Sequence, residues 1–177
     1  SLGGGYYYGL GILRDRAGND RYRGSRYNMG FTAHQAAGIF IDDRGDDHYA
    51  TSHYVALGMS WDESCTVFLE GAGDDTYVAP GFALGAAAMN GFALFEDRAG
   101  ADRYVGAKAA GKYGNHYHGG TNVGMLLDLG AGNDTHSGGR KTGEISAAPE
   151  HAFFIDAPDI EEAVERLRRA PLNADAR

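Results

Sequence analysis

The amino-acid sequence predicts an all-β fold, a parallel β-solenoid of about five 27-residue coils that ends in an amphipathic helix. A short motif recurs along the chain: two apolar residues, any residue, an acid, two residues, Gly, Asn or Asp, Asp, any residue, Tyr. A glycine also stands twelve residues before the leading acid in each of the first four copies. Two patterns with one period indicate a repeat architecture, in which each unit packs only on its neighbours.

Each full copy of the motif carries a leading and a trailing acid. The leading acids follow one another at intervals of 27, 28, 27, 31 and 28 residues, and a partial sixth copy ends the series. They are Asp15, Asp42, Glu70, Asp97, Asp128 and Asp156. The trailing acids are Asp20, Asp47, Asp75, Asp102 and Asp134. This spacing predicts that equivalent residues of successive coils lie directly above one another.

The repeat unit has the features of strands and turns. It shows no apolar period of 3.6 residues and no helix caps, and Gly and Asp bound its short apolar runs. Stacked coils pair at about 4.8 Å, so equivalent residues should form columns. The expected inward columns are Leu13, Phe40, Phe68, Phe95, Leu126 and Phe154, and Tyr22, Tyr49, Tyr77 and Tyr104 ended by His136. Propeller blades of about 40–50 residues do not fit, whereas an antiparallel meander stays an alternative.

The pattern changes after the sixth copy and predicts a capping helix. Asp159 and Glu162 form a capping-box arrangement, and Pro171 ends the segment. Its apolar residues recur on one face, at Ile160, Val164 and Leu167. Because solenoids need terminal caps, we expect about ten helical residues to cover the last coil. The expected divisions are the β-solenoid repeats at 1–145, a last half-coil with the helix at 146–172, and a disordered tail at 173–177.

The first coil shows no such cap. Residues 1–8 (SLGGGYYY) already fit the coil pattern, and an open coil exposes unpaired backbone groups and an apolar face. We therefore expect an upstream domain or a protein partner to cover the N-terminal coil, as it would in the C-terminal portion of a longer protein.

Composition and charge exclude several functional classes. The 177 residues carry a net charge of −8 and scattered basic residues, which excludes the clustered basic face of a nucleic-acid-binding protein. No segment approaches the roughly 18 consecutive apolar residues of a transmembrane helix. Cys65 is the single cysteine, so there is no intrachain disulfide and no multi-cysteine metal site. We expect Cys65 to be a small packed residue and not a nucleophile.

The turn segments DRAGNDRY, DDRGDDHY, EGAGDDTY and DLGAGNDTH resemble the Gly/Asp-rich repeats of the RTX family of calcium-binding parallel β-rolls. The likeness is clearest at 132–135 (GNDT), and more generally the chain is similar to right-handed parallel β-helix proteins with Asp-rich turns. RTX repeats place such turns in tandem, whereas this chain has one turn per long coil. The resemblance implies that Ca²⁺ binds between turns through Asp20, Asp47, Asp75, Asp102 and Asp134.

The negative charges of these stacked acids must be offset by other groups, and the sequence leaves three candidates open. Like carboxylates stacked at about 4.8 Å repel one another. Calcium would relieve the repulsion through oxygen ligands, and backbone N–H groups of the turns would do so by hydrogen bonding. Arginines of the same turns are the third candidates, namely Arg16, Arg21, Arg44, Arg98 and Arg103. Ala101 replaces one Asn or Asp, so not every coil requires the full set.

A second row of polar residues follows the pattern glycines. Four residues after each glycine come Tyr7, His34, Asp62 and Met89, followed by Tyr8, Gln35, Glu63 and Asn90. A histidine one strand spacing from two carboxylates suits general acid–base chemistry or a metal. The catalytic hypothesis is therefore His34, Asp62 and Glu63, with Trp61 and Tyr54 placed to stack on a sugar ring. The alternative is a row of solvated surface residues.

One coil contains an extended segment. Residues 105–124 break the period by three or four residues and contain His116 and His118, which are two residues apart. Two histidines on one strand face are a weak metal signal, and an enlarged loop on a regular scaffold is a common place for binding. A tolerated insertion explains the segment equally well.

These observations favour a non-catalytic structural or interaction module. We expect a rigid β-solenoid, stabilised by calcium under the RTX resemblance, that belongs to a larger exported protein or assembly in the periplasm or outside the cell. Its expected partners are proteins, and a polysaccharide is the second kind. The alternative function is a carbohydrate-binding module or carbohydrate-active enzyme that uses the His34, Asp62 and Glu63 row, an argument by analogy between folds.

Overall fold

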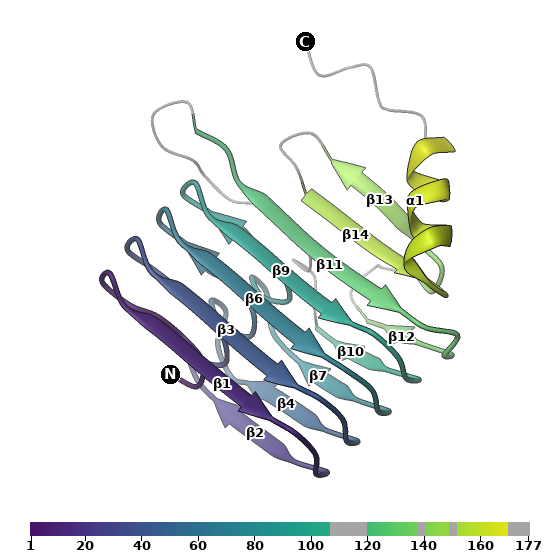
Figure 1. The fold of residues 1–177 in the computed structure, drawn as a ribbon, viewed down its shortest axis with the longest axis horizontal. Coiled ribbons are helices and arrows are strands. Elements are labelled where there is room, and N and C mark those ends of the chain that lie inside the picture. The colour runs from purple at the N-terminus through teal and green to yellow at the C-terminus, as the bar shows by residue number, and fades with distance from the viewer. Residues whose placement is uncertain (107–119, 138–140, 149–151, 170–177) are drawn as a thin grey trace.

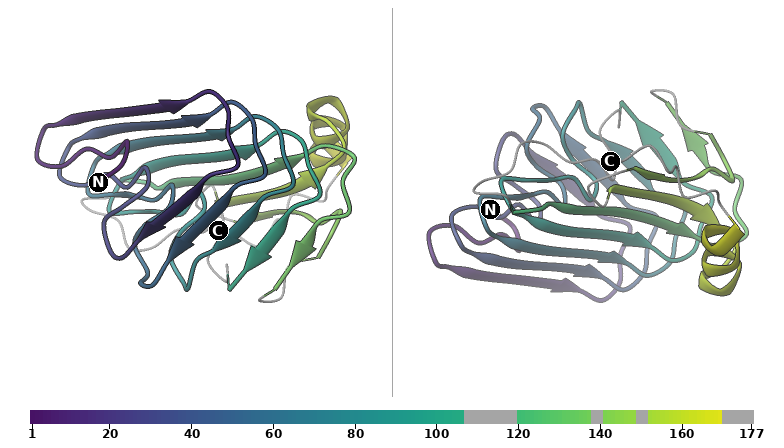
Figure 2. Two further views of the ribbon diagram at one scale, coloured as in Figure 1. Left: turned by 90° about the horizontal axis from the view of Figure 1, so that it is seen from below. Right: turned by 90° about the horizontal axis from the view of Figure 1, so that it is seen from above.

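The computed structural model describes residues 1–106, 120–137, 141–148 and 152–169 and shows a parallel β-solenoid (Figure 1). One sheet contains, in spatial order, β1 (Leu10–Asp15), β3 (Ala37–Asp42), β6 (Cys65–Glu70), β9 (Phe92–Asp97), β11 (Val123–Leu129), β14 (Ala152–Ala157) and β13 (Ile145–Ala148). A second contains β12 (Thr135–His136), β10 (Arg103–Val105), β7 (Thr76–Val78), β4 (His48–Thr51) and β2 (Arg21–Gly24). The third pairs β5 (Ser60–Trp61) with β8 (Ala87–Ala88). Figure 2 shows the two larger sheets as layers that turns join along one edge.

The register of the first sheet confirms the repeat. Phe40 pairs with Phe68, and Phe68 pairs with Phe95, in parallel ladders. Their ring centroids lie 4.5 and 4.7 Å apart, so residues about 27 positions apart in the sequence are nearest neighbours. Coil-to-coil pairing is parallel throughout the described strands and only the β13–β14 hairpin is antiparallel, which rules out the antiparallel meander.

The second inward column also forms as predicted. The rings of Tyr22, Tyr49, Tyr77 and Tyr104 stack at 5.0 to 5.1 Å, and the His136 ring follows Tyr104 at 4.6 Å. These rings meet the phenylalanine column edge to face, an arrangement that aromatic quadrupoles favour. The core is therefore a pair of aromatic columns along the solenoid axis.

The opposite face of the seven-stranded sheet is also largely apolar. Side chains alternate along each strand, so every second residue points outward. Over β1, β3, β6 and β9 the outward residues form three rows, namely Leu10, Ala37, Cys65 and Phe92; Ile12, Ile39, Val67 and Leu94; and Arg14, Ile41, Leu69 and Glu96. Cys65 is exposed in this face, so the expectation that it is a small packed residue is wrong.

Glycine lets the Asp-rich turns stack closely. Gly73 has a φ of +154°, and a Cβ there would collide with the carbonyl oxygen of Gly45 in the preceding coil. Any side chain at this position would force adjacent turns apart, so the recurrent turn glycine follows directly from the coil spacing.

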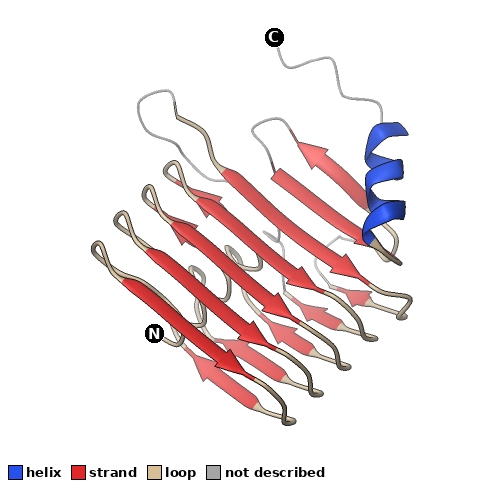
Figure 3. Cartoon of the chain, viewed as in Figure 1, coloured by secondary structure: helices blue, strands red, loops and turns tan. Residues whose placement is uncertain are grey.

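The predicted capping helix is α1 (Ile160–Arg169), drawn in blue in Figure 3. The Asp159 carboxylate accepts the backbone N–H of Glu162 at 2.8 Å, which confirms an Asp N-cap. Ala163 and Leu167 pack on Ile155, on the outer face of the last strands, whereas Ile160 and Val164 stay exposed. The predicted apolar face is thus only partly right, because the helix rests on the outside of β14 and not across the open end of the aromatic columns.

Some sequence-based expectations fall outside the described residues. His116 and His118 belong to 107–119, and the expected tail belongs to 170–177. The described part of the chain contains no helix with the length and apolar character of a membrane-spanning segment.

The aromatic column predicts a position-specific loss of stability. Phe68 is fully buried between two equivalent rings, so Phe68→Ala should destabilise the chain by about 3–5 kcal/mol in urea unfolding. Phe92→Ala removes a ring from the outer face of the neighbouring strand and should change stability by less than about 1 kcal/mol. Equal effects of the two substitutions would contradict the assignment of inner and outer faces.

Candidate functional site

Both acid columns point into the solenoid. Asp42 lies two residues after Phe40, and Asp47 two residues before Tyr49, so the alternation of an extended chain brings all four side chains to the inner face. Asp42 and Asp47 are 1% and 2% exposed. Sequence reasoning nominated only the trailing acids as metal ligands and missed the leading ones, although the same alternation could have identified them.

Backbone amides bind one oxygen of four of the five trailing acids, Asp47, Asp75, Asp102 and Asp134. The Oδ1 atom of Asp47 accepts the Asp20 N–H at 2.6 Å, and the same bond joins each later pair of coils at 2.6 to 2.8 Å. This confirms compensation by turn amides. The expected arginine contribution is not found among the described ion pairs, because those of Arg14 and Arg98 go to Asp43 and Glu96 outside the columns. Among the described ion pairs, the column carboxylates meet only His136.

Tyrosine hydroxyls bind three of the six leading acids, His136 meets two more, and Glu70 has neither kind of partner. Tyr22 and Tyr49 donate to Asp42 at 2.9 and 3.1 Å, and Tyr77 donates to Asp97 at 2.7 Å. Glu70 is completely buried, and neither of its carboxylate oxygens meets an N–H or hydroxyl donor; its polar neighbour is the Asp75 carboxyl, with which it can share a proton. Single oxygens without a hydrogen-bond partner remain on Asp42, Asp97 and Asp102, and the Oδ2 of Asp128 has only the ion-pair contact with His136 at 3.4 Å.

Burial raises the pKa of most of these carboxyl groups. Desolvation, reinforced by the Asp75 charge, raises the pKa of Glu70 to about 10. Burial also raises the pKa of Asp102 to about 8, and those of Asp47, Asp75 and Asp128 to about 6. Such shifts mean that the buried acids hold protons, or another cation, at pH values where free carboxylates are ionised.

The C-terminal end of the column carries its own cation. His136 occupies the tyrosine position, and its Nε2 lies 3.0 Å from Asp156 and 3.4 Å from Asp128. Burial disfavours the imidazolium, but the hydrogen bonds and charges of these two carboxylates outweigh burial and raise the pKa of His136 to about 9. A positive charge is therefore accommodated at this level of the column.

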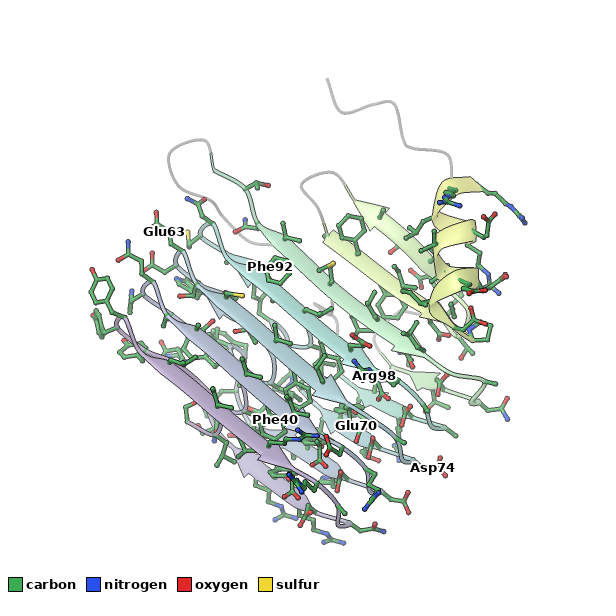
Figure 4. All side chains as sticks on the ribbon, in the orientation of Figure 1. Phe40, Glu63, Glu70, Asp74, Phe92 and Arg98 are labelled. Atoms are coloured by element: carbon green, nitrogen blue, oxygen red, sulfur yellow. The ribbon has the colours of Figure 1, made fainter. Side chains whose placement is uncertain are left out.

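The buried acids form groups with metal-ligand geometry. Within each group, one potential ligand atom per residue lies within 4.8 Å of the others. The groups are Asp42, Asp47 and Glu70; Glu70, Asp75 and Asp97; Asp102, Asp128 and Asp134; and Asp128, His136 and Asp156. Four of the five predicted ligands belong to them, and Asp20, at the open end, does not. Figure 4 shows Glu70 at the end of its strand beside the turns.

The predicted polar row forms a stacked two-residue turn. His34 Nδ1 contacts the Asp62 carboxylate, and Gln35 donates to Glu63 at 2.7 Å. His34 and Asp62 are thus brought together as predicted, while Glu63 pairs with Gln35 on the adjacent column. Both residues of each turn are left-handed, with φ of +61° at His34 and +55° at Glu63. Such strained positions cluster at functional sites.

An aromatic pocket of about 370 Å³ lies beside this turn. Its lining is Tyr6, Arg26, Tyr27, Phe31, Ala33, His34, Tyr54, Val55 and Trp61. The Arg26 guanidinium lies 5.3 Å from the Tyr27 ring centroid and 5.0 Å from that of Tyr54, and it donates to the Tyr54 hydroxyl at 2.9 Å. The pocket thus combines aromatic walls with one fixed cation.

Comparison with protein-family models, curated proteins and solved structures returned no match to this chain. The functional argument therefore depends on the chemistry of two sites, the buried carboxylate columns and the aromatic pocket.

The raised pKa values predict that the metal-free chain loses stability as pH rises. Folded-state pKa values of about 6 to 10 exceed the roughly 4 of unfolded carboxyl groups, so the folded chain binds more protons above about pH 4. His136 acts in the same direction, because stability from its raised pKa is lost as pH rises toward 9. In EDTA, the unfolding midpoint should fall between about pH 5 and pH 8.5.

Glu70→Gln provides the control for this pH dependence. Its amide stays neutral at every pH, so the variant should show a shallower decline than the unsubstituted chain. Asp15 does not contribute over this range, because the Tyr22 hydroxyl lowers the pKa of this partly exposed acid below its ordinary 3.8, and it is ionised in both states above about pH 5. An unfolding midpoint that rises with pH over the same range would contradict the burial of these acids.

Proposed function

We propose that the chain is a non-catalytic structural module, a rigid β-solenoid that divalent cations, Ca²⁺ foremost, stabilise along its column of buried acids. The observation that carries the proposal is Glu70, whose carboxylate is completely buried and meets no N–H, hydroxyl or cationic group among the described residues, only further acids. It lies between Asp42 and Asp47 on one side and Asp75 and Asp97 on the other. An ionised group in this position needs a positive charge nearby, since burying an unpaired carboxylate is strongly unfavourable.

The donor set favours a hard cation. Every ligand in the two groups around Glu70 is a carboxylate oxygen, and Ca²⁺ takes six to eight oxygens at about 2.3–2.6 Å. Two ligands of one such ion lie up to roughly 5 Å apart, which agrees with the 4.8 Å limit within each group. At the level of His136 the sequence supplies the positive charge itself, which supports cation binding at the equivalent levels of the preceding coils.

The cellular setting and the partner remain parts of the proposal. A site of moderate affinity fills where calcium is abundant, as it does for extracellular modules, which is consistent with export to the periplasm or the cell exterior. Leu13 and Tyr22 of the first coil are only partly buried, whereas Phe40 and Tyr49 at the equivalent positions of the next coil are fully buried, which supports coverage of the first coil by a protein partner.

The calcium proposal predicts a chelator-sensitive increase in stability at neutral pH. A hundredfold excess of Ca²⁺ over its dissociation constant should add about 2.7 kcal/mol to the free energy of unfolding, and EDTA should reverse the gain. Equilibrium dialysis with mass spectrometry should find calcium bound to the native chain.

The matched variants are Glu70→Gln and Asp74→Asn. The first removes a buried ligand and should abolish most of the calcium-induced gain, whereas the second neutralises an exposed acid of the same turn and should preserve it (Figure 4). An equal gain in both variants, or no calcium effect on the unsubstituted chain, would overturn the proposal.

The aromatic pocket favours carbohydrate binding as a second candidate function. Tyr27, Tyr54 and Trp61 offer ring faces for the apolar C–H surface of a sugar, and Arg26 and His34 offer polar contacts at the same cavity. The His34–Asp62 pair would place an oriented imidazole beside such a ligand, which is the arrangement that an acid–base role in a carbohydrate-active enzyme requires.

Trp61 makes this second candidate directly measurable. It is the single tryptophan of the chain, so an oligosaccharide that enters the pocket should change the intrinsic fluorescence in a saturable way. A set of neutral and uronic-acid oligosaccharides is the probe, and Arg26→Ala should weaken binding of the uronic acids at least about tenfold if the guanidinium contacts their carboxylate. Unchanged fluorescence across the whole set would remove the carbohydrate candidate.

A further inference from the structure

The outer face of the seven-stranded sheet has a charge pattern that points to a partner. Over β1, β3, β6 and β9, ten of its twelve outward residues are uncharged, and the two charged ones are Arg14 and Glu96. Both belong to one row and stand on the two outer strands of this group. Large exposed apolar patches of this kind are rare on monomeric proteins and mark interaction surfaces.

We infer that this face binds a second copy of the chain, related to the first by a two-fold axis that runs along the strands midway between β3 and β6. This operation lays β1 over the partner's β9 and β3 over the partner's β6, with equivalent rows facing each other. Arg14 of each copy then lies opposite Glu96 of the other copy. All remaining outward residues of the four strands face uncharged residues. The interface is isologous and closed, the commonest kind in homodimers.

Charge complementarity selects this register over its neighbours. A shift of the axis onto β6 would place Arg14 opposite Leu127 and Glu96 opposite Ile41, each charge against an apolar residue, which is unfavourable. In the single chain Arg14 pairs with Asp43 at 2.9 Å and Glu96 with Arg98 at 2.7 Å, so both charges are held in place before association. The four groups would form one mixed network at each end of the interface.

The position of α1 agrees with this arrangement. The helix already covers the same face at its C-terminal end, where Leu167 packs near Ile155 of β14, so the proposed interface continues an existing one (Figure 1). Helices with side chains and face-to-face sheets both need about 10 Å of separation. In the dimer the partner's sheet ends at its β1, which lies over β9. The helix α1 lies over β14, beyond this edge, so it does not obstruct the approach of the two sheets.

The size of the face sets the expected strength. Four strands at about 4.8 Å and six residues at about 3.3 Å span roughly 19 by 20 Å. This is smaller than the roughly 800 Å² per partner of a standard interface. We therefore expect a dimer that dissociates in the micromolar range.

Charge reversal tests the dimer directly. In sedimentation equilibrium, Arg14→Glu and Glu96→Arg should each weaken the dimer at least about tenfold, or about 1.4 kcal/mol, and the double variant should recover most of the affinity. Arg16→Glu makes the same charge change in an exposed turn off this face and should leave the dimer unchanged. Circular dichroism and thermal melting confirm that each variant is folded.

Cys65 gives a second, independent readout. This exposed thiol lies on a central strand, in the row at the N-terminal ends of the strands and opposite Ala37 of the other copy, so dimerisation should slow its alkylation by a maleimide as protein concentration rises. Val67→Lys, a central substitution, should restore fast alkylation at every concentration. A chain that is monomeric at about 100 µM, a double variant no tighter than the single ones, or a Cys65 reactivity independent of concentration would each overturn the inference.

Discussion

The stacking of each coil on an equivalent coil, one strand spacing away, governs every other property of this protein. Because Phe40 pairs with Phe68 and Phe68 with Phe95, each side chain has its own equivalents as nearest neighbours. For aromatic rings the repetition is favourable and produces stacked columns with centroids 4.5 to 5.1 Å apart. For charged groups the same repetition places like charges together, so a motif that builds the core also creates an electrostatic problem.

The chain resolves that problem by several means. Backbone amides bind the trailing acids, tyrosine hydroxyls bind leading acids such as Asp42 and Asp97, and His136 neutralises the C-terminal level of the column. Glu70 receives none of these partners, since the neighbouring hydroxyls of Tyr49 and Tyr77 donate to Asp42 and Asp97. The site proposed for a cation is therefore the level at which the repeat departs from Asp. Where amides, hydroxyls or His136 already stabilise the buried carboxylates, no bound cation is needed. A cation is needed in the coil where the carboxylate has none of these partners.

The two faces of the main sheet have different roles for the same geometric reason. Inward residues are fixed by the columns, whereas outward residues are free to carry an apolar surface with two opposite charges, Arg14 and Glu96. The tight turn that carries His34 and Asp62 contributes a third feature, since its left-handed backbone positions these side chains at the aromatic pocket. Core, proposed interface and pocket thus occupy separate parts of one repeating scaffold.

The sequence by itself determined the repeat, the inward aromatic columns, the C-terminal helix and the proximity of His34 to Asp62, because periodicity fixes which residues share a column. It also contained the inward position of the leading acids, through the two-residue step from Phe40 to Asp42. Only the tertiary structure decided that Glu70 meets no N–H or hydroxyl donor, that α1 rests on the outer face of β14, and that Tyr6, Arg26 and Trp61 converge on one pocket. These features depend on side-chain contacts and on how turns from three coils fold toward one another, which a linear period does not encode.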